Sequence, residues 1–324
     1  MKNGNFVISL DFEIYWGVWD VVKLENYSNH LHGVRQVIPG LLNLFSKYNI
    51  EATFATVGFL FFENKEQLLQ NIPKEKPSYT NKKISPYESH LHLVGNNEAD
   101  DPVHFAPTLL KLIKEAKQEV GCHTFSHYYC LEDGQTVEEF RQDLQAAKAI
   151  AKQLGVELKS FIFPRNQYNE TYLATCKQEG IIAYRGNENS WLYEAKNYES
   201  ETYLRRALRL ADAYINLTGH HCHDVKWQNE NEPCNIPASR FLRQYKKGSA
   251  FLEGLRLQRI KKSMTHAARK GLTYHLWWHP HNFGVNLKEN LSFLEEILKH
   301  YQLLQSKYNF KSTNMQNLAQ ASRK

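Results

Sequence analysis

The chain has 324 residues, of which 42% are hydrophobic and 23% are charged, and its formal net charge is +6. This size and composition are typical of a globular protein with a large core, and they fit one large α/β barrel in a single domain, residues 1–324. The small positive excess does not by itself indicate a nucleic-acid partner, and we expect none. The five cysteines include no C-x-x-C pair, which argues against a disulfide framework and favours a reducing compartment.

The N-terminal residues lead directly into an apolar strand-like segment, without a stretch that resembles a signal peptide. No window approaches the roughly 18 apolar residues of a membrane span. We therefore expect a cytoplasmic protein with no transmembrane segment. Nothing in the sequence indicates the oligomeric state.

Short apolar segments alternate with amphipathic ones along the chain. Expected strands cover residues 6–10, 52–57, 119–122, 160–163, 181–184 and 272–278. Expected helices cover residues 34–48, with the regular part starting near Pro39, then 107–119, 136–154, 170–179, 241–270 and 291–308. Residues 73–101 and 187–239 are polar and irregular, and are interpreted as loop insertions, the first as a candidate lid. The alternation predicts a parallel sheet or barrel.

Two acidic residues and two histidines stand out near the ends of these strands. Asp11 and Glu13 alternate at the end of the first strand, so both side chains can face one cleft. His123 and His127 are four residues apart and can share a face if they lie on a helical turn. One carboxylate and two imidazoles are a common ligand set for a divalent metal, which leaves the other carboxylate free to act on water. The pattern indicates a metal-assisted hydrolase.

Three further polar residues follow predicted strands: Arg165, Arg185 and His279. In α/β folds the catalytic residues lie where parallel strands end, so these positions are consistent with a single active site. Each residue also has a structural interpretation. The acidic pair could form a turn or salt bridge, the histidines could be packed or capping residues, Arg165 could belong to a structural ion pair, and Arg185 could be a solvated charge.

The chain resembles the polysaccharide deacetylases, the carbohydrate esterases with a NodB homology domain. The segment SLDFE at residues 9–13 is similar to the family's acidic motif, although many members have adjacent aspartates. The segments EATFA at 51–55 and EVGCHTFSH at 119–127 resemble its second strand and its histidine motif. Looser matches are FPRNQ at 163–167, YRG at 184–186 with Trp191, and WHP at 278–280.

The resemblance implies a distorted (β/α) barrel and metal-dependent removal of acetyl groups from an N-acetylated sugar. It implies that Glu13, His123 and His127 hold one divalent metal ion, with Zn2+ expected and other transition metals open. Asp11 would be the general base, held by Arg165, and His279 the general acid. His281 competes with His279 for the acid role, but His279 fits the motif better.

Flat and basic groups are expected around the carbohydrate. We assign Trp191, Arg185 and Trp278 to substrate binding. Trp277 and Trp278 alternate along one strand, so one should face the core and the other the cleft.

Two other segments have plain alternatives. The tract GHHCHD at 219–224 is interpreted as a loop near the opening of the site rather than a structural zinc site, because no second half with finger-like spacing follows. The basic stretch 240–269 could meet phosphate or anionic lipid, but a solvated helix face is favoured.

These features favour a carbohydrate N-deacetylase in glycan biosynthesis that acts on a cytoplasmic sugar precursor. A hydrolase of C–N bonds in a small amide is the alternative within the same chemistry. A barrel that binds glycan without catalysis is the alternative of another class.

Overall fold

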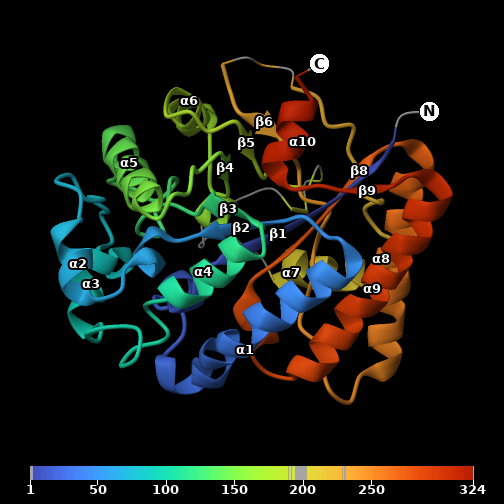
Figure 1. Ribbon diagram of the computed structural model, residues 1–324, viewed down its shortest axis with the longest axis horizontal. Coiled ribbons are helices and arrows are strands. Elements are labelled where there is room, and N and C mark those ends of the chain that lie inside the picture. Colours follow the sequence, from blue (N-terminus) through green and yellow to red (C-terminus); the bar gives the residue numbers. More distant parts are fainter. Residues whose placement is uncertain are drawn as a thin grey trace.

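A parallel sheet forms the centre of the molecule in the computed structural model, which describes residues 3–188, 190, 192–193, 203–227, 229 and 231–323 (Figure 1). The strands are β1 (Asn5–Phe12), β2 (Ala52–Thr56), β3 (Glu119–Cys122), β4 (Ser160–Phe161), β5 (Ala183–Tyr184), β6 (Cys234–Asn235), β7 (Arg240–Phe241), β8 (Thr273–Trp278) and β9 (Lys311–Ser312). Their order is β6-β5-β4-β3-β2-β1-β8-β7, and β9 pairs with β1. Every strand pair is parallel.

The short segment between β6 and β7 joins the two ends of this strand order. The N–H of Ala238 donates to the carbonyl of Gly186, just after β5, at 2.8 Å. The next residue, Ser239, donates its N–H to His275 in β8, also at 2.8 Å. Two consecutive residues therefore bond to strands near the two ends of the strand order. This connection curls the sheet into the distorted barrel that the family resemblance implied.

Helices cover the outside of the sheet. The longer ones are α1 (Leu24–Tyr48), α4 (Pro107–Glu115), α5 (Val137–Gln153), α6 (Glu170–Gln178), α7 (Tyr203–Asp212), α8 (Ala250–Lys270) and α9 (Leu287–Tyr308). The shorter ones are α2 (Lys65–Gln70), α3 (Pro86–Ser89) and α10 (Met315–Ala321). Helix α9 packs against α1 and α8, whereas α5 packs against α6 on the other side of the barrel (Figure 1). Helices thus cover the barrel on both of these sides, and β1 is buried from Phe6 to Phe12.

Three helix predictions differ from the structure. Helix α1 begins at Leu24 and contains Pro39, because its buried face extends upstream through Leu31 and Val34 and offsets the cost of the proline. The helix expected from residue 241 begins at Ala250, since the preceding residues form β7 and a turn. Helix α7 lies inside the segment 187–239, which was expected to consist of loops.

The strand ends gather the candidate residues. Strand β1 lies between β2 and β8, and its carboxyl end carries Asp11 and leads into Glu13. Strands β3 and β8 lead at the same end into His123 and His279. In the described part of the chain, no helix combines the length and the apolar character needed to cross a membrane.

Candidate active site and metal centre

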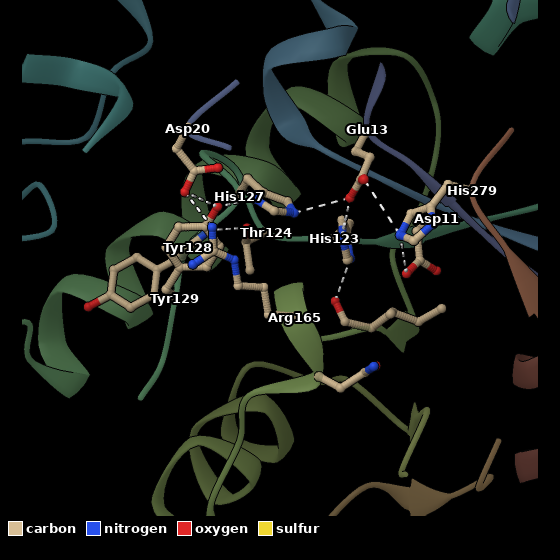
Figure 2. A network of polar contacts seen from close by, with 12 residues as sticks. Asp11, Glu13, Asp20, His123, Thr124, His127, Tyr128, Tyr129, Arg165 and His279 are labelled. Carbon is tan, nitrogen blue, oxygen red and sulfur yellow. Dashed lines mark hydrogen bonds and ion pairs between the residues drawn. The ribbon is translucent and has the colours of Figure 1, made fainter. Parts of the chain in front are cut away.

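Glu13, His123 and His127 meet in a buried cluster at the carboxyl end of the sheet (Figure 2). The Oε2 atom of Glu13 lies 3.1 Å from Nε2 of His123 and 3.1 Å from Nε2 of His127. The three residues offer ligand atoms that all lie within 4.8 Å of one another. The structure therefore brings together the three residues that the sequence assigned to a metal.

The two histidines share this cluster without a helical turn, contrary to the expectation. They lie in a loop after β3, in which Thr124 and His127 have positive φ angles of 62° and 59°. The backbone between them is held by the buried carboxylate of Asp143 in α5, which accepts the N–H groups of Phe125 and Ser126 at 2.6 and 3.1 Å. Left-handed backbone is costly for residues with a side chain, so the loop is shaped for the position of its imidazoles.

The outer nitrogen of each imidazole is committed as a donor. Nδ1 of His123 lies 2.8 Å from the carbonyl oxygen of Ile162, which can only accept. Nδ1 of His127 lies 3.2 Å from the hydroxyl of Tyr129, whose own proton is donated to Asp20 at 3.1 Å. In the neutral rings both Nε2 atoms then carry lone pairs, and these face the Glu13 oxygen.

The charges of the cluster favour a cation between these atoms. Burial raises the pKa of Glu13, but His279, His123 and His127 more than offset this, so its pKa lies well below the usual range. Burial lowers the pKa of His127, more than its contact with Glu13 raises it. The ionised carboxylate therefore needs positive charge beside it, which protons on the imidazoles or a metal ion between these atoms can supply.

The spacing also fits a divalent metal. Zinc bonds of roughly 2.0–2.1 Å in tetrahedral geometry place neighbouring ligand atoms about 3.3 Å apart. The two 3.1 Å separations are close to this value. The three residues could therefore serve as ligands of a catalytic zinc site that keeps one position open. Bonding of the outer nitrogens to a carbonyl and to a tyrosine supplies the second layer of contacts that such ligands require.

Asp11 is paired with Arg185, and the expected contact with Arg165 was wrong. The guanidinium of Arg185 donates to Oδ1 of Asp11 at 2.6 Å and to Oδ2 at 2.8 Å. Burial raises the pKa of Asp11, but Arg185 together with His123 and His279 outweighs burial, and the net pKa is lowered. The guanidinium also donates to Ser9 and Asn166 and lies 3.9 Å above the ring of Trp277. Arg185 is buried in these contacts, which corrects its assignment to substrate binding.

Arg165 belongs to a neighbouring network at the edge of the cluster. It forms an ion pair with Asp20, and its guanidinium lies 4.0 Å above the ring of Tyr129. Because Asp20 also accepts the hydroxyl of Tyr129, Arg165 reaches His127 through these two residues, as Figure 2 shows. The sequence contained little indication of this network. Asp20 lies in no motif, and Tyr129 only follows the histidine motif at 119–127.

His279 faces both carboxylates from the third side. Its Nε2 atom lies 3.7 Å from Oδ2 of Asp11 and 3.6 Å from Oε1 of Glu13. Its Nδ1 atom lies 3.5 Å from the amide nitrogen of Asn282, which can only donate. This contact favours the tautomer with the proton on Nε2. The side chain of His279 is 25% exposed, whereas the other two imidazoles and both carboxylates are buried.

The tryptophans do not lie as assigned. Trp278 is fully buried and stacks on Phe283, so it faces the core and its assignment to substrate binding was wrong. Trp277 faces the site instead: its ring lies under Arg185 and 5.6 Å from the ring of His279. Alternation along the strand cannot make this choice, because it fixes only that the two rings point in opposite directions. Trp191 lies outside the described residues.

The histidine tract at 219–224 lies at the opposite end of the barrel. His223 forms a β-bridge with Thr273, the first residue of β8, whereas the candidate site follows its last residue. The expected place near the opening of the site was therefore wrong. His220 bonds Ser263 and His221 bonds Thr218, so these imidazoles have separate partners. No group of metal-ligand type is found among them within the described part of the chain.

Comparisons with known proteins agree with this architecture. Residues 28–184 match the family model "Polysaccharide deacetylase", which includes both histidines but not Asp11, Glu13 or His279. No curated protein matches the chain in sequence.

Solved structures with this fold span nearly the whole chain. A Mycobacterium smegmatis protein assigned to the polysaccharide deacetylases has a TM-score of 0.63 at 13% identity, over 99% of this chain and 90% of that one. A Pseudomonas aeruginosa PAO1 protein with the same assignment has a TM-score of 0.57 at 11% identity, over 98% and 89%. The Puue allantoinase has a TM-score of 0.55 at 11% identity, over 98% and 88%. Residues 28–184 are thus similar in sequence to the polysaccharide deacetylases, and the chain as a whole is similar in fold to solved structures of proteins with that assignment.

Proposed function

We propose that the protein is a metal-dependent hydrolase that removes acetyl groups from an N-acetylated sugar. The observation that carries the proposal is the arrangement of His123 and His127, whose outer nitrogens are committed as donors while their Nε2 lone pairs meet the Glu13 carboxylate. The family match supports deacetylation of a carbohydrate. A divalent ion held by these ligands would lower the pKa of water and polarise the amide carbonyl.

The proposal gives Asp11 the role of the base and His279 the role of the acid. Asp11, kept ionised by Arg185, would accept the proton of the attacking water. His279, with its proton on Nε2, would donate to the nitrogen of the amide as the C–N bond breaks. Arg185 orients the base without touching the substrate, and Trp277 offers a flat face beside the acid for a sugar ring. The products are acetate and the free amino sugar.

The first experiment measures metal content and acetate release together. Elemental analysis should find about one tightly bound divalent ion per chain in the wild type and none in the His123→Ala/His127→Ala variant, with parallel loss of acetate release from N-acetylated sugars. Asp11→Asn should retain the metal and lose turnover, since Asp11 is paired with Arg185 and not with the histidines. Loss of metal in Asp11→Asn would reverse the roles proposed for Asp11 and Glu13.

A second candidate reaction is hydrolysis of a C–N bond in a small amide. The observation in its favour is the likeness in fold to the Puue allantoinase over 98% of this chain. The two candidates are separated by substrate: metal binding without acetate release, but with turnover of a small cyclic amide, would select the second. If the protein holds no ion after incubation with excess metal, both candidate reactions are overturned and a binding protein without catalysis is favoured.

A further inference from the structure

The Glu13 carboxylate has two sides, and the metal cluster uses only one of them. Its Oε2 atom faces His123 and His127, whereas its Oε1 atom lies 3.6 Å from Nε2 of His279. A ring nitrogen of His281 completes a second group, in which the ligand atoms of Glu13, His279 and His281 all lie within 4.8 Å of one another. Two sets of three ligands therefore share one carboxylate.

His281 is the member of this group that has no role in the proposed reaction. Its side chain is 3% exposed, and Nδ1 is buried without a hydrogen-bond partner among the described residues. The ring stacks on His279, with centroids 5.0 Å apart and planes 12° from parallel, and meets Tyr27 edge-on. A packing residue would fill this space without an unpaired polar atom, which costs about 1–3 kcal/mol when buried. An imidazole beside a carboxylate and another imidazole has the chemistry of a metal ligand.

We propose that Oε1 of Glu13, His279 and His281 form a second site for a divalent transition-metal ion, which inhibits the enzyme by occupying the nitrogen of its general acid. The inference rests on the proposed function, since it takes His279 as the acid. A carboxylate that bridges two metal ions is the arrangement of two-metal centres, in which the ions lie roughly 3.5–4 Å apart. Here the second ion would compete with a proton and would not assist the reaction.

The local contacts explain why this second ion should bind more weakly than the first. The Glu13–His279 separation of 3.6 Å is longer than the 3.1 Å separations of the first cluster, so the ligands must move closer. Asn282 also favours the proton on Nε2 of His279. Metal binding there would shift that proton to Nδ1, and rotation of the Asn282 amide would let its oxygen accept it. Inhibition should therefore appear only at metal concentrations above those that activate.

The test counts bound zinc in the full-length protein and three variants. Metal-free protein is titrated with Zn2+, and bound zinc is measured after equilibrium dialysis. His281→Phe keeps the stacked aromatic ring and removes the ligand, and His281→Asn serves if the phenylalanine variant fails to fold. His32→Gln removes an exposed imidazole and controls for loose binding to the other histidines.

We expect about two ions per chain in the wild type and in His32→Gln, and about one in the His281 variant. Acetate release should fall in excess zinc in the wild type and stay level in the His281 variant. One ion per chain in the wild type and in the His281 variant would overturn the second site and leave the proposed function standing. No tightly bound ion in the wild type would overturn the proposed function together with this inference.

Discussion

The buried pair of Asp11 and Arg185 allows a stability prediction with a defined size. Arg185→Met keeps much of the apolar stem of the side chain but removes two charge-assisted hydrogen bonds, of 2.6 and 2.8 Å, to a carboxylate that is only 3% exposed. Breaking a buried ion pair from one side costs about 3–5 kcal/mol, because the remaining charge has no partner. The contacts of Arg185 with Ser9 and Asn166 are lost as well. We expect a loss of about 4 kcal/mol at neutral pH.

The pH dependence provides a second check on the same variant. In the wild type the lowered pKa of Asp11 stabilises the fold above the ordinary pKa of an aspartate, and this contribution disappears as the pH falls through the lowered value. Without Arg185, burial dominates and raises the pKa of Asp11. In the variant, protonation of Asp11 therefore removes the cost of its unpaired charge at a higher pH than in the wild type. The stability difference between the two proteins should therefore narrow as the pH is lowered from neutrality.

Urea unfolding of metal-free protein at several pH values measures both effects. Arg141→Met is the matched control, because Arg141 is 27% exposed and its ion pairs with Glu138 and Glu179 span 3.3–3.4 Å. Its expected cost is below about 1 kcal/mol. A cost for Arg185→Met as small as that of the control, or a difference that does not change with pH, would refute the reasoning about the pair.

Three further predictions concern the residues behind the metal ligands. Gly17→Ala should abolish tight zinc binding in a folded protein, because a Cβ atom there would lie 1.9 Å from Cδ of Glu13 and turn its carboxylate away. Zinc titration checks this prediction. Gly254→Ala is the control, because a Cβ atom at Gly254 would lie in open space. Tyr129→Phe should weaken zinc affinity about 10- to 100-fold, since Nδ1 of His127 loses its acceptor, and unchanged affinity would contradict that role. Asp143→Asn should cost about 1–3 kcal/mol in urea unfolding, because an amide cannot accept all the donors that the carboxylate does, and a neutral result would count against its hold on the histidine loop.

The alternation of strands and helices predicted a parallel sheet or barrel, and the family resemblance implied the distorted barrel. The residues that meet at its carboxyl end could be predicted because strand ends and short-range spacing can be read from the local sequence. Asp11, Glu13, His123 and His279 each follow an apolar strand, and parallel strands bring such positions to one edge. The FPRNQ segment instead directed attention to Arg165, although Arg185 reaches the base. Which arginine reaches Asp11 depends on which strand end projects over β1, and the local sequences around Arg165 and Arg185 do not decide it.

Tertiary contacts outweighed local signals elsewhere too. Pro39 was interpreted as a helix start, but the buried face of α1 continues upstream of it. Trp277 and Trp278 could be separated into site and core only once the pairing of β8 with β1 was known. The conformation of the loop that carries His127 could not be predicted from the spacing of the two histidines, because it depends on the carboxylate of Asp143 in α5.

The position of β1 in the sheet has a consequence for the order of folding. This first strand pairs with β8 from Asn5↔Thr273 to Leu10↔Trp278, so one of its two edges finds its partner only in the last quarter of the chain. During synthesis its amide groups on that edge remain unpaired, while the other edge can already join β2. Contacts between residues so distant in sequence form slowly. A nascent chain would hold Glu13 and both imidazoles long before His279 arrives, and so would acquire its proposed ligands first and its proposed acid last.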